Sequence, residues 1–385
     1  MKFLGQKRRT QVLENLTNTL YCAIMNIITK YGSDNGHHTK RSRKDLFMKL
    51  KKQFSDFYDE IRIQGESEQL REKREILQED IENKFPDELK KHGIELKKSD
   101  IEIFDQGSYK LNTTIKDTII DRDVAVMIPL DIEKYSDPRD IKGYLRDALK
   151  YVEARTVNIK EPCVNVAYYE NGEEWMHIDL PLYAIHKGNV YLARGREFGD
   201  KYSWELADPK GLNADLLGKI NGKAQLRRVI RYIKKWKNEK YKNSILDHEI
   251  PPSIGLTYLV CDCFVESTEK DDDLVSLQKT LEAIRNQFTT TIQNGVIVRA
   301  DISRFLPVQP YTDVFKTMKD SSDNYGVTFY KRLDKAIENL TNAVNVESDH
   351  DAGVYVQKVF GTDFNVPPKQ VIVSSTSNKK EHSFG

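Results

Sequence analysis

The stretch Gln106-Gly107-Ser108, followed after a short segment by Asp121-Arg122-Asp123-Val124, decides the fold of this chain. Residues two apart in a β-strand point to the same face, so a strand through Asp121 and Asp123 sets their carboxylates side by side. Adjacent carboxylates repel each other, and this arrangement is costly unless a cation neutralises them. Mg²⁺ is the natural candidate because it prefers oxygen ligands and bridges carboxylates to phosphates; Mn²⁺ is the second choice.

The turn before these acids supplies a complementary phosphate site. Glycine at position 107 lets the backbone approach a ligand closely, and the turn at Ser108 offers N–H groups and a hydroxyl. A lone Gly-Ser pair is uninformative, and a lone Asp-x-Asp is more often a solvated strand edge. However, Asp179 lies in a second apolar strand, Trp175 to Ile185, where a stray charge is expensive. Three strand carboxylates after a Gly-Ser turn favour a two-metal phosphoryl-transfer site over a surface acidic patch.

Outside this stretch the residue patterns divide the chain into regions. Residues 1–100 are typical of helices, near 10–30, 45–63 and 66–85, with Pro86 ending the last. Residues 101–210 predict strands at 101–104, 124–128, 156–169, 175–185 and 190–193, a helix near 140–151, and turns at 171–172 and 187–188. Residues 211–370 predict helices near 213–241 (one helix or a pair), 254–265, 273–288, 325–344 and 350–359. The expected class is α+β, a mixed-sheet lobe beside a helical lobe, with a flexible tail at 371–385.

Composition limits the class of partner. The chain has 385 residues, 39% hydrophobic and 31% charged, as in soluble globular proteins. Its 60 Lys and Arg nearly balance its 59 Asp and Glu, whereas proteins that grip long nucleic acid usually carry a basic excess. We therefore expect local recognition of small phosphates. The four cysteines lack metal-site spacing, and the apolar stretch near residues 20–28 is too short to span a bilayer, so we expect a cytoplasmic protein with no membrane partner.

In its motifs the chain resembles the bacterial CD-NTases, the cyclic-oligonucleotide synthases of CBASS antiphage systems, within the polymerase-β-like nucleotidyltransferase superfamily. The family's Gly-Ser pair matches Gly107-Ser108, its paired acids match Asp121 and Asp123, and its third acid matches Asp179 in a His-Ile-Asp-x-Pro-x-Tyr-Ala-Ile strand. A Leu-Arg-x-Val-x-Arg-x-x-Lys-x-Trp helix matches residues 226–236, and a Pro-x-Ser-Ile segment matches 251–254. The pattern is most similar to the dinucleotide cyclases that make cyclic GMP–AMP.

The resemblance implies a polymerase-β-like lobe and a metal-dependent enzyme that joins nucleoside triphosphates, ATP or GTP first, into a cyclic di- or oligonucleotide with release of pyrophosphate. The implied catalytic and metal-binding residues are Asp121, Asp123 and Asp179. The implied nucleotide-binding residues are Gln106, Gly107, Ser108, Lys234 and Ser253. The other cations on the helix of Lys234 are expected to be mostly solvated; they are Arg227, Arg228, Arg231, Lys235 and Lys237.

Two positions depart from the family pattern. The residue between the paired acids is usually apolar but here is Arg122, which we expect to point away from the metals and to be able to pair with a nearby carboxylate. Asn165 stands near where the dinucleotide cyclase has a base-contacting arginine, so base choice is not carried over. Tyr109 is expected either to stack on a base or to belong to the core.

Two alternatives to a cyclase stay open. The first is a transferase of the same superfamily that adds a nucleotide to RNA or to a protein; the near-neutral charge speaks against a tRNA substrate only. The second is a non-enzymatic scaffold, although a binding module has no use for three crowded carboxylates. The resemblance also suggests an E1/E2-like conjugating partner at Gly385, against the default of a flexible tail.

Overall fold

The computed structural model describes residues 49–63, 68–116, 119–151, 155–246, 249–269, 271–320 and 326–369. The helix expected near residues 10–30, the tail at 371–385 and Gly385 lie outside the described residues. Within the described ranges, none of the helices has the length and apolar character needed to cross a membrane.

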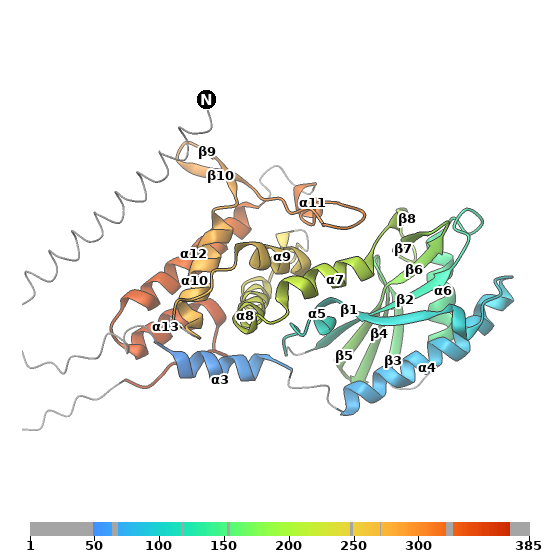
Figure 1. Cartoon of the computed structure of the whole chain (residues 1–385), viewed down its shortest axis with the longest axis horizontal. Coiled ribbons are helices and arrows are strands. Elements are labelled where there is room, and N and C mark those ends of the chain that lie inside the picture. Colours follow the sequence, from blue (N-terminus) through green and yellow to red (C-terminus); the bar gives the residue numbers. More distant parts are fainter. Residues whose placement is uncertain are drawn as a thin grey trace, which may run out of the picture. The chain divides into compact units, whose positions relative to one another are not determined.

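A mixed eight-stranded sheet forms the centre of the first lobe (Figure 1). Its key strand, β2 (Ile120–Pro129), pairs antiparallel with β1 (Glu102–Gln106) and parallel with β5 (Glu173–Leu180) and β6 (Leu182–His186). The other strands extend the sheet through antiparallel pairs: β3 (Arg155–Ile159), β4 (Val164–Glu170), β7 (Asn189–Gly195) and β8 (Tyr202–Leu206). The predicted mixed sheet is therefore confirmed.

Two predicted strands were too long, and prolines mark both breaks. The predicted strand at 156–169 is the hairpin β3–β4, whose turn contains Pro162 and closes with Lys160 N–H donating to the Cys163 carbonyl at 3.0 Å. The predicted strand at 175–185 is interrupted at Pro181, which has no N–H for the ladder. Its carbonyl still accepts from Val126 N–H at 3.0 Å, so β5 and β6 continue along β2 without losing register.

Helices α4 (Glu68–Lys91) and α6 (Pro138–Leu149) cover one face of the sheet (Figure 1). The prediction that α4 ends before Pro86 was wrong, because its buried stripe continues through Phe85 to Leu89 and offsets the cost of an internal proline. The helix ends instead at Lys91 and is closed by Gly93 (φ 75°), where Gly93 N–H donates to the Lys90 carbonyl and Ile94 N–H donates to the Leu89 carbonyl. This side of the sheet is filled with apolar side chains, which leaves the opposite face for chemistry.

The second lobe is helical. It contains α3 (Lys51–Ile61), α8 (Ala224–Tyr241), α9 (Ser253–Cys263), α10 (Asp273–Arg285), α12 (Val327–Asn345) and α13 (Asp349–Phe360). The predicted helix at 213–241 is the pair α7 (Pro209–Ile220) and α8, separated at Gly222 (φ 77°). The remaining short helices are η1 (Lys98–Asp100), α5 (Gly107–Lys110) and α11 (Lys316–Lys319). Strands β9 (Thr289–Gln293) and β10 (Val296–Asp301) form a hairpin that the residue patterns did not predict.

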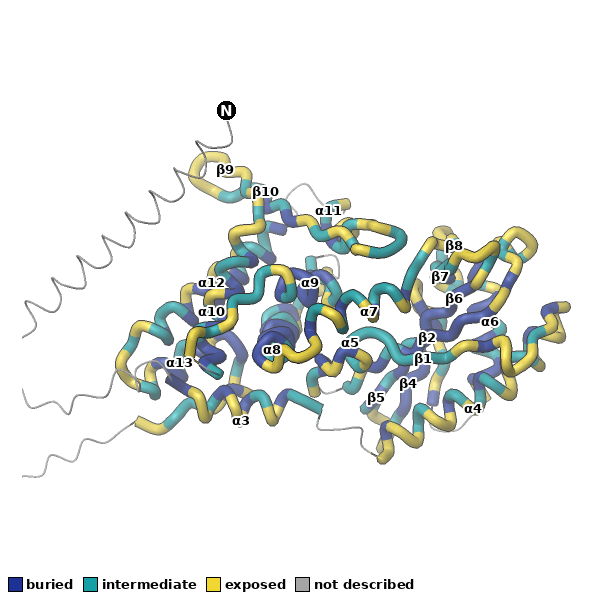
Figure 2. Tube along the Cα trace, viewed as in Figure 1, coloured by how far each residue is buried: buried dark blue, intermediate teal, exposed yellow. Residues whose placement is uncertain are grey.

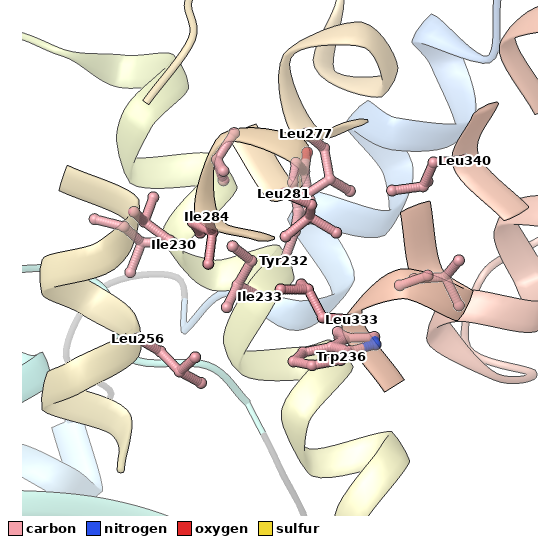
Figure 3. Packing of buried hydrophobic residues seen from close by; sticks show 14 of the residues in the cluster. Ile230, Tyr232, Ile233, Trp236, Leu256, Leu277, Leu281, Ile284, Leu333 and Leu340 are labelled. Carbon is pink, nitrogen blue, oxygen red and sulfur yellow. The ribbon is translucent and has the colours of Figure 1, made fainter. Parts of the chain in front are cut away.

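Helix α8 is the central element of this second core. Figure 3 shows Ile230, Ile233 and Trp236 of α8 among side chains of α9, α10 and α12. Figure 2 shows α8 mostly in the dark blue of buried residues, as are the central strands of the sheet. A helix enclosed on several sides must satisfy its charged side chains inside the protein, and two of them, Lys234 and Lys237, line the site described next.

Candidate active site

Strand pairing brings the predicted acids together. In β2 the side chains of Val124, Val126 and Ile128 point to the face that α4 and α6 cover. Asp121 and Asp123 occupy the alternate positions and therefore point to the opposite, open face. In the parallel β2–β5 pair, Asp123 lies opposite Asp179, and Asp121 lies opposite His177. Ligand atoms of Asp121, His177 and Asp179 all lie within 4.8 Å of one another, which is compatible with a divalent cation. His177 belongs to the motif that revealed Asp179, but no feature of that motif assigned His177 to the site.

The turn between β1 and α5 lies directly on the Asp123 carboxylate. Gln106 at the end of β1 is the register partner of Asp123, and the chain then turns through Gly107 at φ 63°. A Cβ atom at position 107 would lie 2.1 Å from Asp123 Oδ2. Glycine is therefore required here by the backbone conformation and by the closeness of the carboxylate.

The Asp123 carboxylate is buried beside two other acids. Burial, followed by the neighbouring charges of Asp121 and Asp179, raises its pKa to about 7. Within the described ranges, no hydrogen bond or ion pair of the Asp123 carboxylate is found. Carboxylate oxygens crowded in this way suit Mg²⁺ or Mn²⁺, so the residues present fit a divalent cation.

His177 and Glu174 orient Asp121. His177 Nε2 lies 3.2 Å from Asp121 Oδ1, and His177 Nδ1 lies 2.9 Å from Glu174 Oε1. The hydrogen bond to Asp121 is the main reason that the pKa of His177 is raised to about 9. The imidazole therefore keeps a positive charge next to Asp121 at neutral pH in the metal-free protein.

Asn165 holds the third acid. Its Nδ2 donates to Asp179 Oδ1 at 2.6 Å from the adjacent strand β4, where the two residues are register partners. Lys160 Nζ lies 3.7 Å from the same carboxylate oxygen. The amide therefore fixes the orientation of Asp179 in this chain, at the position where the family resemblance suggested a contact to a base.

A cavity of about 310 Å³ brings most of the predicted site residues together. Its lining includes all of the predicted residues except Gln106 and Asp179, namely Gly107, Ser108, Asp121, Asp123, Lys234 and Ser253. Gln106 lines a neighbouring cavity of about 1000 Å³ and accepts a hydrogen bond from Tyr183 Oη at 3.2 Å. Gly107, Asp123 and Asn213 line both cavities, so the two spaces meet beside the carboxylates.

The far wall of the smaller cavity is suited to phosphate. Helix α9 begins at Ser253, so its N-terminal N–H groups and partial positive charge lie at the cavity wall. Lys237 Nζ donates to Ser253 Oγ at 2.6 Å. Lys234 is buried, and burial, followed by Lys237 and Arg231, lowers its pKa to about 7. An anion bound here would restore the positive charge of Lys234. Lys237 was missed as a cavity residue, although its spacing of three from Lys234 puts both on one helix face.

The expectation that the other cations of α8 are mostly solvated was wrong for three of them. Arg231 is 2% exposed, Arg228 donates to the buried carboxylate of Asp273 at 2.7 Å, and Lys235, with 13% of its side chain exposed, pairs with Asp363. All three face neighbouring helices or loops because α8 is enclosed rather than lying on the surface. A helix with many cations gives no periodic sign of which ones are buried.

Arg122 lies on the other side of β2 from the site, as expected. Its Nη2 donates to Asp105 Oδ1 at 2.8 Å, and its guanidinium lies 3.6 Å from the centre of the Tyr109 ring. Tyr109 therefore packs against Arg122, but it is only half-buried and belongs to none of the hydrophobic cores found among the described residues. Arg122 thus contacts both Asp105 at the end of β1 and Tyr109 in α5, the two elements that flank the Gly107 turn.

The raised pKa of Asp123 leads to a testable effect on stability. A carboxyl group with a higher pKa in the folded state destabilises the fold increasingly as pH rises from the unfolded value of 3.8 to the folded value of about 7. We expect Asp123→Asn to stabilise the metal-free protein at pH 8, by on the order of 3 kcal/mol, and by much less at pH 5. Thermal denaturation in EDTA at both pH values measures this difference. Equal stabilisation at the two pH values would contradict it.

The comparisons with known proteins point to one family. A model described as "Cyclic GMP-AMP synthase DncV-like, nucleotidyltransferase domain" matches residues 101–183. A cyclic GMP-AMP synthase of Escherichia albertii is 28% identical over 186 residues, which cover 45% of this chain and 39% of that protein. The matched region therefore spans well under half the length of this curated relative.

Solved structures share the fold across most of the chain. Vibrio cholerae DncV in its apo form has a TM-score of 0.59 and 17% identity, covering 82% of this chain and 96% of that chain. The CD-NTase CdnG of Bradyrhizobium diazoefficiens, in complex with GTP, has a TM-score of 0.61 and 13% identity, covering 80% and 94%. Residues 101–183 thus match a DncV-like nucleotidyltransferase domain, and most of the chain shares the fold of these solved structures.

Proposed function

We propose that this chain joins nucleoside triphosphates by nucleotidyl transfer and closes the product into a cyclic di- or oligonucleotide. The observation that carries the proposal is the cavity in which the carboxylates of Asp121 and Asp123 face Ser108, Lys234 and the first residue of α9. Carboxylates on one wall suit a cation, and cationic groups on the other suit a triphosphate. A surface acidic patch would not lie opposite a buried lysine.

In the proposed reaction the donor triphosphate lies between these walls. Ser108, Lys234 and Ser253 bind its β- and γ-phosphates, which leaves the α-phosphorus beside the acids. The ribose hydroxyl oxygen of a second nucleotide forms a bond to this phosphorus, and the bond from the α-phosphorus to the bridging oxygen breaks. Pyrophosphate leaves with that electron pair, and the hydroxyl proton passes to a carboxylate oxygen of Asp179.

The chain's own residues contribute orientation and charge. Asn165 keeps Asp179 in one position, and His177 does the same for Asp121. Asp121, Asp123 and Asp179 would hold Mg²⁺ or Mn²⁺, which when bound neutralises phosphate charge and makes the attacking hydroxyl more acidic. No covalent intermediate with the protein is needed, because phosphoryl transfer depends chiefly on positioning and electrostatic stabilisation.

The larger cavity supports a second nucleotide and hence a cyclic product. Its volume of about 1000 Å³ adjoins the smaller cavity at Gly107, Asp123 and Asn213, so an acceptor there would present its ribose to the carboxylates. A cyclase must also keep its linear intermediate while it turns for the second reaction. The related DncV of Vibrio cholerae has been solved with a linear intermediate, 5′ pppA(3′,5′)pG, at a TM-score of 0.54.

The substrates that we propose are ATP and GTP, and the biological role is antiphage signalling in the cytoplasm. GTP accompanies the CdnG structure, and ATP with GTP accompanies another DncV structure. The antiphage role and an E1/E2-like conjugating partner at Gly385 rest on the family resemblance alone.

The purified full chain, incubated with labelled ATP, GTP, CTP and UTP and Mg²⁺, tests this proposal. We expect a labelled product that resists phosphatase, because a cyclic product has no terminal phosphate, together with release of pyrophosphate. Omitting one triphosphate at a time identifies the bases. Label that appears on added RNA or protein instead of a small product would contradict the cyclase. No product with any triphosphate and either metal would contradict transfer between nucleotides.

A further inference from the structure

We propose that Arg231 is a positioning residue for the triphosphate site. It fixes the segment Asn112-Thr113-Thr114, and this segment in turn orients the Ser108 hydroxyl. Through Tyr58, Arg231 also makes that orientation depend on helix α3. The inference rests on the proposed function, because it matters only if Ser108 binds a phosphate of the donor nucleotide.

The guanidinium of Arg231 donates to three partners, of which two lie in the segment 112–114 and one lies on helix α3. Its Nε donates to the Thr114 carbonyl at 3.1 Å, its Nη2 donates to Asn112 Oδ1 at 2.9 Å, and its Nη1 donates to Tyr58 Oη at 3.1 Å. Arg231 is only 2% exposed, and among the described residues it forms no salt bridge. Burial of a guanidinium without a carboxylate is costly, and an apolar side chain would avoid that cost. The feature to explain is therefore how the planar guanidinium of Arg231 fixes the positions of its three partners.

The segment held by Arg231 is bonded to the turn that carries Ser108. Thr113 N–H donates to the Ser108 carbonyl at 2.8 Å, and the hydroxyls of Thr114 and Ser108 lie 3.0 Å apart. Lys234, one turn after Arg231 on α8, donates to the Thr113 carbonyl at 3.2 Å. Ser108, Thr114 and Lys234 all line the smaller cavity. A shift of the segment would therefore move two phosphate-binding groups at once.

The end of helix α3 contacts the two residues that follow this segment. Lys116 N–H donates to the Ile61 carbonyl at 2.6 Å, and Arg62 forms an isolated antiparallel bridge with Ile115. Tyr58 on α3 supplies the remaining partner of Arg231. The chain after Ser108 thus bonds to both α3 and α8, so a shift of α3 would change the position of the residues that line the cavity.

Arginine meets this requirement and lysine does not. The planar guanidinium presents its donors in a fixed fork and can bond three acceptors in different directions at a set spacing. A lysine would present one nitrogen on a flexible stem and would leave the Asn112 or Tyr58 oxygen unsatisfied. We therefore expect Arg231→Lys to weaken binding of the triphosphate nearly as much as Arg231→Met.

The test compares Arg231→Met with Arg228→Met in the full chain. Arg228 lies one turn earlier on α8 and is also partly buried, but it bonds Asp271 and Asp273 and does not line the cavity. Isothermal titration with a non-hydrolysable GTP analogue gives the Kd, and thermal denaturation gives Tm. We expect both variants to lower Tm, because each leaves partners of the lost arginine unsatisfied. Only Arg231→Met should raise Kd, by about 10-fold, which corresponds to the loss of one or two hydrogen bonds.

Two milder variants keep the inference testable if Arg231→Met does not fold. Tyr58→Phe and Thr114→Val each remove one hydroxyl and retain the size of the side chain. We expect each to raise Kd by about 3-fold, and the double variant to raise it by less than the product of the two, because both act through the position of Ser108. KM for the triphosphate should rise in parallel.

The outcomes separate this inference from the proposed function. If the unmodified chain binds the analogue and Arg231→Met or the milder variants bind equally well, with only Tm changed, Arg231 has a structural role and the inference fails. Multiplicative effects of Tyr58→Phe and Thr114→Val would also overturn it, because the two hydroxyls would then act independently. If the unmodified chain neither binds the analogue nor transfers nucleotides, the proposed function fails first, and this inference fails with it.

Discussion

Replacing Asp121 and Asp123 together with asparagine is expected to lower nucleotide product formation by roughly 10³-fold or more, because a cation that stabilises transition-state charge contributes several kcal/mol. Asparagine keeps the shape of each side chain and removes the charge that would hold the cation. The β2–β5 register leaves Asp179 opposite the altered residue 123, so one acid alone would remain. Single-turnover assays with labelled ATP and GTP measure the loss.

A second acidic cluster in the same lobe provides the matched control. Asp131 and Glu133 are exposed and lie near His186, with ligand atoms as close together as those of Asp121, His177 and Asp179. Neither Asp131 nor Glu133 lines the two cavities described above. The double variant Asp131→Asn/Glu133→Gln should keep the rate within about 2-fold, as surface substitutions away from a site usually do. Comparable losses in the two double variants would mean that loss of negative charge, rather than loss of a metal site, lowers the rate.

Local sequence predicted the carboxylates but not the geometry that joins them. Strand alternation places Asp121 and Asp123 on one face, and the cost of burying a charge singled out Asp179 in its apolar strand. The register that sets Asp123 opposite Asp179, and Asn165 opposite Asp179, pairs residues far apart in the sequence. No local pattern specifies such a register, so the role of Asn165 in holding Asp179 could not be predicted.

The expectation that the other cations of α8 are solvated failed for a different reason. These cations span several faces of the helix, so most of them were expected to face solvent. Here α8 is surrounded by neighbouring elements, and Arg231 satisfies its donors on a tyrosine hydroxyl, an asparagine and a carbonyl. None of these partners carries a charge that a sequence pattern could have matched to Arg231. The boundary predictions failed where tertiary packing outweighed local preference, as in the continuation of α4 past Pro86.

Gly107→Ala is expected to lower the rate of nucleotidyl transfer by about 10²-fold with little change in the fold. The backbone at position 107 has φ 63°, where an alanine costs roughly 1–2 kcal/mol. The added Cβ would lie 2.1 Å from Asp123 Oδ2 and 3.0 Å from Asp123 Cγ, so either this carboxylate or the Ser108 turn must move. Misplacing a catalytic group by about 1 Å is enough to cost about 10²-fold.

Gly188→Ala separates the backbone cost from the displacement of Asp123. Gly188 has φ 80°, and nothing lies within 4 Å of a Cβ added there. Both variants should therefore lower Tm by a similar amount, since each forces alanine into the left-handed region. Only Gly107→Ala should lower the rate. If the two variants lose rate equally, backbone strain is the common cause and the contact between Gly107 and Asp123 does not set the position of the carboxylate. If only Gly107→Ala is affected, the β1–α5 turn holds Asp123 in place, and no side chain other than hydrogen is tolerated at that position.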